Sequence, residues 1–163
     1  MRSVDSIQKK IFDLPTLVRQ VNQWKFLQKK IVFTNGCFDI LHEGHIYSLS
    51  QAASSGDVLI IGVNTDESVT RLKGNSRPVN NEHSRSLILA SLAIVDAVIL
   101  FNEETPLQLI KTIMPDILVK GGDYIVEQIA GAKEVIANGG EVKIVPLLQG
   151  FSTTGLIDKI HRL

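Results

Sequence analysis

The chain has 163 residues, close to the size of one domain, and its 17 Lys and Arg residues balance 17 Asp and Glu residues. A formal net charge of zero excludes the broad basic surface of a nucleic-acid-binding protein, and 44% hydrophobic residues exclude a disordered chain. The longest apolar runs, such as residues 58–63, are far shorter than the roughly 18 to 20 residues that cross a bilayer, so no membrane span is expected.

The pattern of apolar residues alternates between helical and strand spacing along the whole chain. Asp13 and Pro15 mark the start of the first helix, and Asn35 and Gly36 end the first strand. The predicted elements, in order, are a helix over 14–27, a strand over 31–34, a helix over 45–55, a strand over 58–63, a helix over 84–94, a strand over 97–101, a helix from 105 to 114, a strand over 117–119, a helix over 132–137 and a strand over 142–147. Residues 65–83 form the least regular stretch and are predicted to be a mobile loop over the site.

Five strands that are apolar throughout are typical of a parallel sheet covered on both faces. The sequence therefore predicts an α/β fold, a Rossmann-like, doubly wound, five-stranded parallel sheet with helices on both faces. We expect a single domain over 1–163, in which 1–29 is an N-terminal helical extension and 30–163 is the α/β core. In such sheets the ligand lies outside the carboxyl ends of the strands, so the residues after each strand are the candidates for chemistry.

The segment 34–45, between the first strand and its helix, is the richest in such residues. Gly36 and Gly44 let the backbone approach a phosphate closely, and His42 and His45 carry imidazoles that donate hydrogen bonds. The helix that follows adds unpaired N–H groups at its start. These features predict a polyphosphate site, although the chain has neither the P-loop motif nor the dinucleotide motif G-x-G-x-x-G.

The same residues have two other interpretations. His42 and His45 are zinc ligands in one, but Cys37, His83 and His161 are too few and too scattered to complete a tetrahedral site, so no protein metal site is expected. In the other, the two histidines are ordinary surface or core residues. Cys37 is interpreted as a structural thiol, since no histidine and carboxylate single it out as a nucleophile.

Cations and hydroxyls follow several of the later elements. Lys73 lies in the predicted loop, and Lys120 ends a strand directly before Gly121 and Gly122, so both are candidates for phosphate or nucleotide contact. Residues 152–154 precede a short helix, where they cap its start and equally offer hydroxyls and N–H groups to a phosphate. Asp39 either orients the phosphate-binding groups or contacts the acceptor or a metal, and the sequence leaves these roles open.

The motif His42-x-Gly44-His45, after a strand ending in Thr34-Asn35-Gly36-x-Phe38-Asp39, resembles that of the cytidylyltransferase-like nucleotidyltransferases. The resemblance covers about residues 30 to 162 and is closest to the bacterial D-glycero-β-D-manno-heptose 1-phosphate adenylyltransferases. The further segments that carry it are Val63-Asn64-x-Asp66, Arg71-Leu72-Lys73-Gly74, Arg77-Pro78-Val79-Asn80, Val119-Lys120-Gly121-Gly122-Asp123-Tyr124 and Ser152-Thr153-Thr154. One departure is His83-Ser84-Arg85, where the resemblance predicts Glu-Gln-Arg, so the role of that acid is in question.

The resemblance implies transfer of AMP from ATP to a sugar 1-phosphate, giving ADP-heptose and pyrophosphate for lipopolysaccharide core synthesis. Mg²⁺ is expected to bind through the substrate rather than the protein. The resemblance is also compatible with a homodimer. The family often fuses this module to a sugar kinase, and we expect a stand-alone transferase here. The implied catalytic residues are His42, His45 and Lys73, and the implied nucleotide-binding residues are Thr34, Asn35, Gly36, Phe38, Asp39, Gly44, Lys120, Gly122, Asp123, Ser152, Thr153 and Thr154.

Two alternative functions remain open at this point. A cytidylyltransferase acting on glycerol 3-phosphate or another phospho-alcohol is disfavoured because 147–153 lacks the arginine of that branch. A non-catalytic nucleotide-binding module is disfavoured because both histidines and Lys73 are present. The polar start of the chain and a single cysteine make the cytoplasm the expected compartment.

Overall fold

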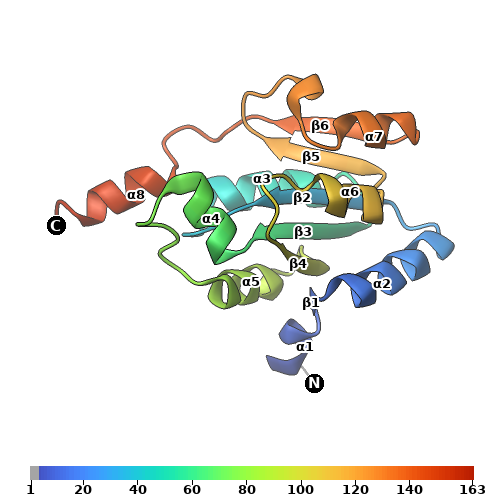
Figure 1. Ribbon diagram of the computed structural model, residues 1–163, viewed down its shortest axis with the longest axis horizontal. Helices are drawn as coiled ribbons and strands as arrows, with labels where there is room; N and C mark the ends of the chain where they lie inside the picture. Colours follow the sequence, from blue (N-terminus) through green and yellow to red (C-terminus); the bar gives the residue numbers. More distant parts are fainter. Residues whose placement is uncertain (1–3) are drawn as a thin grey trace.

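The computed structural model describes residues 4–163, which fold around one six-stranded parallel sheet with helices on both faces (Figure 1). The order of the strands is β1-β4-β3-β2-β5-β6. Their bounds are β1 Ile11–Phe12, β2 Ile31–Gly36, β3 Val58–Asn64, β4 Ala97–Phe101, β5 Ile117–Gly121 and β6 Glu141–Val145. The predicted fold class, a Rossmann-like parallel sheet, is confirmed.

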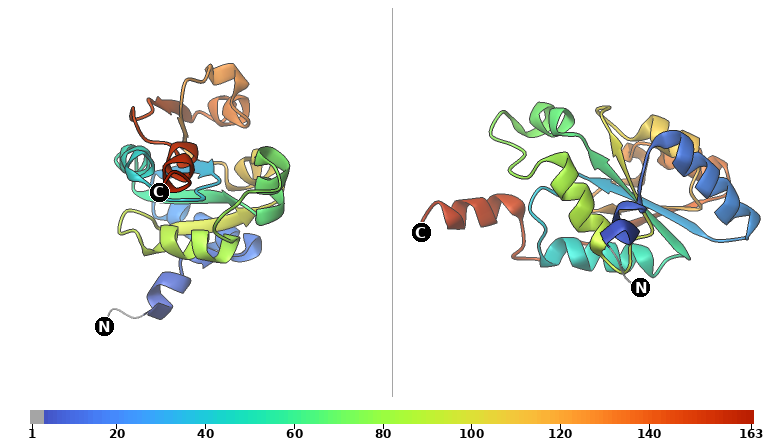
Figure 2. Two further views of the ribbon diagram at one scale, coloured as in Figure 1. Left: turned by 90° about the vertical axis from the view of Figure 1, so that its left-hand side faces the viewer. Right: turned by 90° about the horizontal axis from the view of Figure 1, so that it is seen from below.

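The helices connect successive strands and cover both faces of the sheet. They are α1 Val4–Gln8, α2 Leu14–Phe26, α3 Glu43–Ala53, α4 Asp66–Lys73, α5 Glu82–Ser91, α6 Leu107–Ile113, the 3-10 helix η1 Val126–Gln128, α7 Ala132–Ala137 and α8 Thr153–Ile160. Helix α8 projects away from the body of the molecule in Figure 1 and in the right-hand view of Figure 2. Within residues 4–163, no helix is both long enough and apolar enough to cross a membrane.

Alternating side chains of the central strands build two separate cores. Phe33 and Ile60 point to one face, where Leu17 and Val21 of α2 join them together with residues of α6 and α7. Val32, one position along β2, points to the other face, where residues of α3 and α5 pack. Because these side chains are almost fully buried on both faces, the strands have no polar side, as the sequence indicated.

The expectation of five strands is wrong by one, since residues 11 and 12 add an edge strand that pairs with β4. A strand of two residues is too short to produce a periodic signal in the sequence. The N-terminal segment therefore contributes a strand to the sheet as well as helices. Its helix α2 packs on this sheet, and Trp24 lies against the core.

The stretch 65–83, predicted to be an irregular loop, contains a helix. Thr65 caps α4 by accepting a hydrogen bond from the backbone of Ser68 at 3.2 Å, and Val69 is buried beneath the helix. The other seven residues of α4 are polar or partly exposed, so the sequence gives no clear apolar periodicity for this helix. The irregular part is reduced to residues 74–81.

The strand order reverses at β2, because β3 lies on one side of it and β5 on the other. The connections that leave β2 and β5 therefore diverge, and a crevice opens between the carboxyl ends of these two strands. The loop after β2 carries the His-x-Gly-His motif, and the loop after β5 follows Lys120. This position in the sheet brings the two motifs together.

Candidate active site

A cavity of about 350 Å³ lies at the carboxyl ends of β2 and β5, between the start of α3, the end of α4 and the start of α8. Twelve of the predicted site residues line it: Thr34, Asn35, Gly36, Phe38, Gly44, His42, His45, Lys73, Lys120, Ser152, Thr153 and Thr154. Three predicted residues, Asp39, Gly122 and Asp123, do not line it. Segments that are more than 100 residues apart in the chain thus form one site, which we call the main pocket.

The two histidines are stacked on each other in the wall of the main pocket. The ring centroids of His42 and His45 are 3.8 Å apart with an interplanar angle of 23°, and the Phe38 ring packs edge-on against His45 at 5.3 Å. His42 is the N-cap residue of α3, and Gly44 follows in the first turn. A Cβ atom at Gly44 would lie 3.2 Å from both the His42 ring and Phe151, so glycine permits this close packing.

Burial favours the neutral form of both imidazoles. Burial lowers the pKa of His45 to about 4, with further contributions from the neighbouring His42 and Lys73, and burial also lowers the pKa of His42. The Nδ1 atoms of both rings are buried and have no hydrogen-bond partner among the described residues. The other nitrogen, Nε2, is left as the atom of each ring that can meet a ligand.

Two lysines that are far apart in the sequence, Lys73 and Lys120, bring positive charge to the main pocket. Lys73, at the end of α4, is exposed and lies close enough for its charge to lower the pKa of His45. Lys120 donates a hydrogen bond to Asn35 Oδ1 at 3.4 Å, and its Nζ lies 5.5 Å from the centre of the Tyr124 ring. Burial lowers the pKa of Lys120, which disfavours a buried cation without an anionic partner.

The start of α8 closes another side of the main pocket. Ser152 is the N-cap residue, and its Oγ accepts a hydrogen bond from Gly155 N at 3.0 Å. Leu147 and Phe151 add apolar wall from the segment that leads into this helix, although both side chains are largely exposed. No side chain of α8 is buried, so the helix reaches the site without packing on the core.

Asp39 binds the loop after α4 and makes its contacts there. Its carboxylate accepts hydrogen bonds from Val79 N at 2.8 Å and Asn80 N at 2.9 Å, and it pairs with Arg77 Nε at 2.5 Å. Burial raises the pKa of Asp39, but the backbone N–H groups of Asn80 and Val79 and the Arg77 guanidinium together keep it below its ordinary value. Of the roles left open for Asp39, the structure gives it an orienting one, because its side chain fixes residues 77–80 beside the His-x-Gly-His loop.

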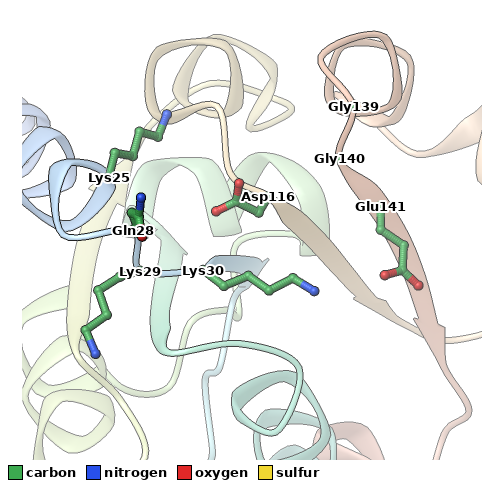
Figure 3. Close-up of a pocket in the computed structure, with 8 residues that line it drawn as sticks. All are labelled: Lys25, Gln28, Lys29, Lys30, Asp116, Gly139, Gly140 and Glu141. Carbon is green, nitrogen blue, oxygen red and sulfur yellow. The ribbon is translucent and has the colours of Figure 1, made fainter.

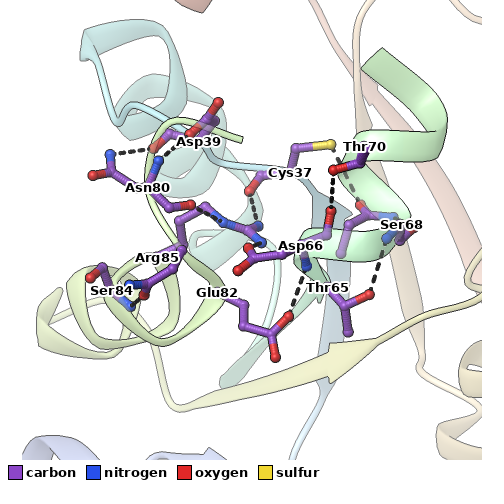
Figure 4. A network of polar contacts seen from close by, with 12 residues as sticks. Cys37, Asp39, Thr65, Asp66, Ser68, Thr70, Asn80, Glu82, Ser84 and Arg85 are labelled. Atoms are coloured by element: carbon purple, nitrogen blue, oxygen red, sulfur yellow. Dashed lines mark hydrogen bonds and ion pairs between the residues drawn. The ribbon is translucent and has the colours of Figure 1, made fainter. Parts of the chain in front are cut away.

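Arg85 ties the same loops together from beneath the site (Figure 4). Its buried guanidinium donates to Cys37 O at 2.6 Å and Asn80 O at 3.0 Å and pairs with Asp66 Oδ1 at 2.7 Å. Glu82 accepts a hydrogen bond from Asp66 N at 2.7 Å. A carboxylate therefore precedes Arg85 in this helix, at 82, and it caps α4 instead of entering the main pocket.

The described residues include no group of three or more His, Cys, Asp or Glu side chains placed to hold a metal ion. The lining of the main pocket is made of imidazole, ammonium, hydroxyl, amide and apolar groups, and it has no carboxylate. Such a lining suits a polyanion better than a cation. Cys37 lies in the same wall, and burial raises the pKa of its thiol, which agrees with a structural role.

A second cavity, of about 560 Å³, lies at the opposite end of the sheet (Figure 3). It is lined by both acidic and basic residues, among them Lys25, Lys30, Asp116 and Glu141. Lys25 Nζ donates to Ile113 O and Met114 O at 2.8 and 2.9 Å, and Asp116 accepts from the backbone of β2. Several of these charged groups already form hydrogen bonds within the protein, so we do not place the functional site there.

The main pocket also contains eight residues that are outside the predicted set of site residues, although two of them, Gly121 and Tyr124, lie in the segment 120–124 where the pocket was expected: Cys37, Ser48, Leu49, Gly121, Tyr124, Leu147, Leu148 and Phe151. Tyr124 belongs to a quoted motif, so its place beside Lys120 was within reach of the sequence. Leu147 and Phe151 gave a weaker signal, apolar side chains in a connection outside any strand. Gly122 N donates a hydrogen bond to Val145 O at 3.0 Å, which ties this glycine to the carboxyl end of the parallel neighbour β6, and Asp123 is exposed beside it.

The family model described as cytidylyltransferase-like matches residues 33–154. A relative named bifunctional protein HldE, from Koribacter versatilis, is 52% identical over 159 residues, which is 98% of this chain and 33% of that protein. The protein of the same name from Actinobacillus pleuropneumoniae is 58% identical over 89% of this chain and 30% of its own length. This chain therefore spans about a third of the length of the curated relatives it matches.

Two solved structures resemble the fold. The lipopolysaccharide core biosynthesis protein from Thermoplasma volcanium matches with a TM-score of 0.57 and 31% identity, over 74% of this chain and 97% of that one. Pantoate-beta-alanine ligase from Francisella tularensis matches with a TM-score of 0.62 over 94% of this chain and 78% of that one, at 18% identity. The second likeness concerns the fold alone.

Proposed function

The chain belongs to the cytidylyltransferase-like family, and from that premise we propose that this domain transfers AMP from ATP to heptose 1-phosphate. The products are ADP-heptose, a precursor of the lipopolysaccharide core, and pyrophosphate. The observation that carries the proposal is the convergence of two neutral histidines and two lysines on a pocket without a carboxylate. Extensive identity to proteins named bifunctional protein HldE supports the choice of branch.

In the proposed reaction, an oxygen of the sugar 1-phosphate forms a bond to the α-phosphorus of ATP. The bond between that phosphorus and the bridging oxygen breaks, and pyrophosphate leaves with the electron pair. The attacking phosphate is already an anion, so no general base is needed. Catalysis then depends on positioning the two substrates and on stabilising negative charge at the transferring phosphoryl group.

His42 and His45 stabilise this charge as neutral hydrogen-bond donors. Because Nδ1 of each ring is buried and has no hydrogen-bond partner within residues 4–163, we assign the proton to Nε2, where it faces the phosphates. A neutral donor held by packing needs no proton transfer and no reorientation during the reaction. Lys73 and Lys120 supply positive charge beside them, and the burial of Lys120 strengthens its interaction with an anion.

The start of α8 binds the far part of the triphosphate in this proposal. The unpaired backbone N–H groups of its first turn and the hydroxyls of Ser152, Thr153 and Thr154 are the donors. Leu147 and Phe151 cover the nucleoside. Mg²⁺ enters with the triphosphate as part of the substrate, since the lining of the main pocket offers no carboxylate to hold it.

A panel of nucleotides and acceptors assayed for pyrophosphate release tests the proposal. We expect the highest kcat/KM for ATP with heptose 1-phosphate, and a value at least about tenfold lower when CTP replaces ATP, because a purine pocket leaves cytosine with unpaired polar groups. A higher value for CTP with glycerol 3-phosphate would instead identify a cytidylyltransferase. Nucleotide binding without any pyrophosphate release would identify a non-catalytic module.

A further inference from the structure

A further cavity, of about 410 Å³, adjoins the main pocket. It lies between the segment that follows β4, the η1 helix and the end of α4, and we call it the side cavity. Its volume is within the range of about 300 to 1,000 Å³ that is typical of small-molecule sites. It shares six lining residues with the main pocket: Asn35, Gly36, Cys37, Lys73, Lys120 and Tyr124.

The shared residues place both lysines at the boundary between the two cavities. A phosphate bound by Lys73 and Lys120 is therefore open to the main pocket on one side and to the side cavity on the other. The proposed reaction joins the acceptor phosphate to the α-phosphate of the nucleotide. The acceptor phosphate must therefore bind at the boundary between the two cavities, where its oxygen can reach the α-phosphorus. The group attached to the acceptor phosphate then extends into the side cavity.

The lining that belongs to the side cavity alone has a different chemistry. It includes Glu104 and Thr105 from the segment after β4 and Gln128 from η1. All three are exposed, and in the described part of the chain none of their side chains makes a hydrogen bond or an ion pair. The neighbouring Glu103, by contrast, accepts a hydrogen bond from Asn102 N at 3.1 Å with its own carboxylate.

A carboxylate, an amide and a hydroxyl suit a neutral ligand that carries many hydroxyl groups. Glu104 repels a second phosphate, so a ligand in the side cavity must be anionic only at the lysines. A carboxylate that accepts a hydrogen bond from a hydroxyl group binds it more strongly than a neutral acceptor does. These properties together describe a sugar with a single phosphate.

We propose that the side cavity binds the sugar of the acceptor, and that Glu104 and Gln128 determine specificity by hydrogen bonding to its hydroxyl groups. The proposal rests on the proposed function and adds the location of the acceptor and the residues that recognise it. It separates the roles of the two cavities. The main pocket binds ATP, the side cavity binds the sugar, and the lysines hold the phosphate between them.

Steady-state kinetics of Glu104→Gln and Gln128→Ala test this proposal, with Glu127→Gln as the matched control. Glu127 is also exposed and lies next to Gln128, but it does not line the side cavity. We expect each test variant to raise the KM for heptose 1-phosphate about tenfold, because a hydrogen bond to a hydroxyl group of the sugar is lost. The KM for ATP stays within about twofold of the parent value, and the control variant changes neither constant.

Methyl phosphate, used as a competitor of heptose 1-phosphate, separates sugar recognition from phosphate recognition. Its inhibition constant does not rise in either test variant, since its only contacts are with the lysines. Test variants that match Glu127→Gln, or that raise the KM for ATP equally, would overturn the sugar site while leaving the proposed function intact. A parent protein that releases no pyrophosphate with any sugar 1-phosphate would overturn both.

Discussion

The two ends of the parallel sheet differ in what their polar side chains bind. At the amino ends, each of three aspartates precedes a strand and accepts a backbone hydrogen bond from the neighbouring strand. The pairs are Asp57 with Lys30 N at 2.8 Å, Asp96 with Leu59 N at 2.8 Å and Asp116 with Ile31 N at 2.7 Å. These side chains complete the sheet, so they have little capacity left for a ligand.

At the carboxyl ends, the polar side chains are held in place but not satisfied. His42 and His45 are fixed by stacking and burial, and their Nδ1 atoms have no partner in the part of the chain that the structure describes. Among the described residues, Lys120 makes one long hydrogen bond, to Asn35 at 3.4 Å, and its Nζ lies 5.5 Å from the centre of the Tyr124 ring. The comparison teaches that charge and concavity do not identify the site, since both ends have them. Unsatisfied polar groups that the fold holds rigidly do identify it.

The largest expected effect is at the carboxyl end, in His45→Ala. Loss of one preorganised donor to the transferring phosphoryl group costs about 3 to 4 kcal/mol in the activation barrier, so kcat should fall about 10²- to 10³-fold. Pyrophosphate release measures this, and circular dichroism checks the fold. His42→Ala should behave alike. A natively folded variant with nearly the parent rate would remove the catalytic assignment of that histidine.

Asp39→Ala perturbs a satisfied group that lies beside the site. Its carboxylate is 2% exposed, and its removal leaves Arg77 and the N–H groups of residues 79 and 80 without their acceptor. Breaking a buried ion pair of this kind lowers the free energy of unfolding by about 3 kcal/mol. Denaturant titration measures the change. An unfolding free energy equal to that of the parent protein would show that residues 77–80 do not depend on Asp39.

Asp116→Ala makes the corresponding change at the amino end. Ile31 N loses its side-chain acceptor, which should lower the free energy of unfolding by about 1 to 2 kcal/mol. The kcat and both KM values should stay at the parent level, because Asp116 is at the end of β5 opposite to Lys120. A large loss of kcat in a stable Asp116→Ala protein would contradict the division between the two ends.

A further expected effect concerns the pH dependence of stability. The unfolded chain protonates His45 near its ordinary pKa of 6.5, but the folded protein does so only near 4. The unfolded state therefore binds more protons between these values, and stability is lost as the pH falls from about 6.5 to 4. His45→Asn should reduce this loss in denaturant titrations at several pH values. An unchanged acid limb in His45→Asn, equal to that of the exposed control His161→Asn, would argue against a buried neutral imidazole.

The sequence predicted the parts of the fold that give a strong local signal. The five longer strands are rich in apolar residues, and the helices between them have caps or glycine ends, so both the class and the order of elements could be derived. Strand β1 was missed because two residues have no period, and α4 because its exposed polar residues resemble a loop. Stability of such elements comes from contacts with distant strands, which the local pattern does not contain.

In the candidate site, too, the residues with a local sequence signal could be predicted, and those that depend on distant contacts could not. His42 and His45 could be found because the motif is contiguous, and Lys120 because it ends a strand. The partners of Asp39 could not be found, since Arg77 and Asn80 lie about 40 positions further along the chain. The pairing of Arg85 with Cys37 and Asp66 is hidden for the same reason. Spacing along the chain identifies groups that act side by side, but not the groups that hold them.

The most direct measurement is an NMR titration of the protein, labelled with ¹⁵N in its histidine rings and its backbone, with ATP and Mg²⁺. We predict that the Nε2 signals of His42 and His45 shift as the nucleotide binds, while their Nδ1 signals stay those of an unprotonated nitrogen. The amide of Ile31, which bonds Asp116 at the other end of the sheet, should not move. Nucleotide binding that shifts the Ile31 amide and leaves both Nε2 signals unchanged would contradict the placement of the phosphates at the two histidines.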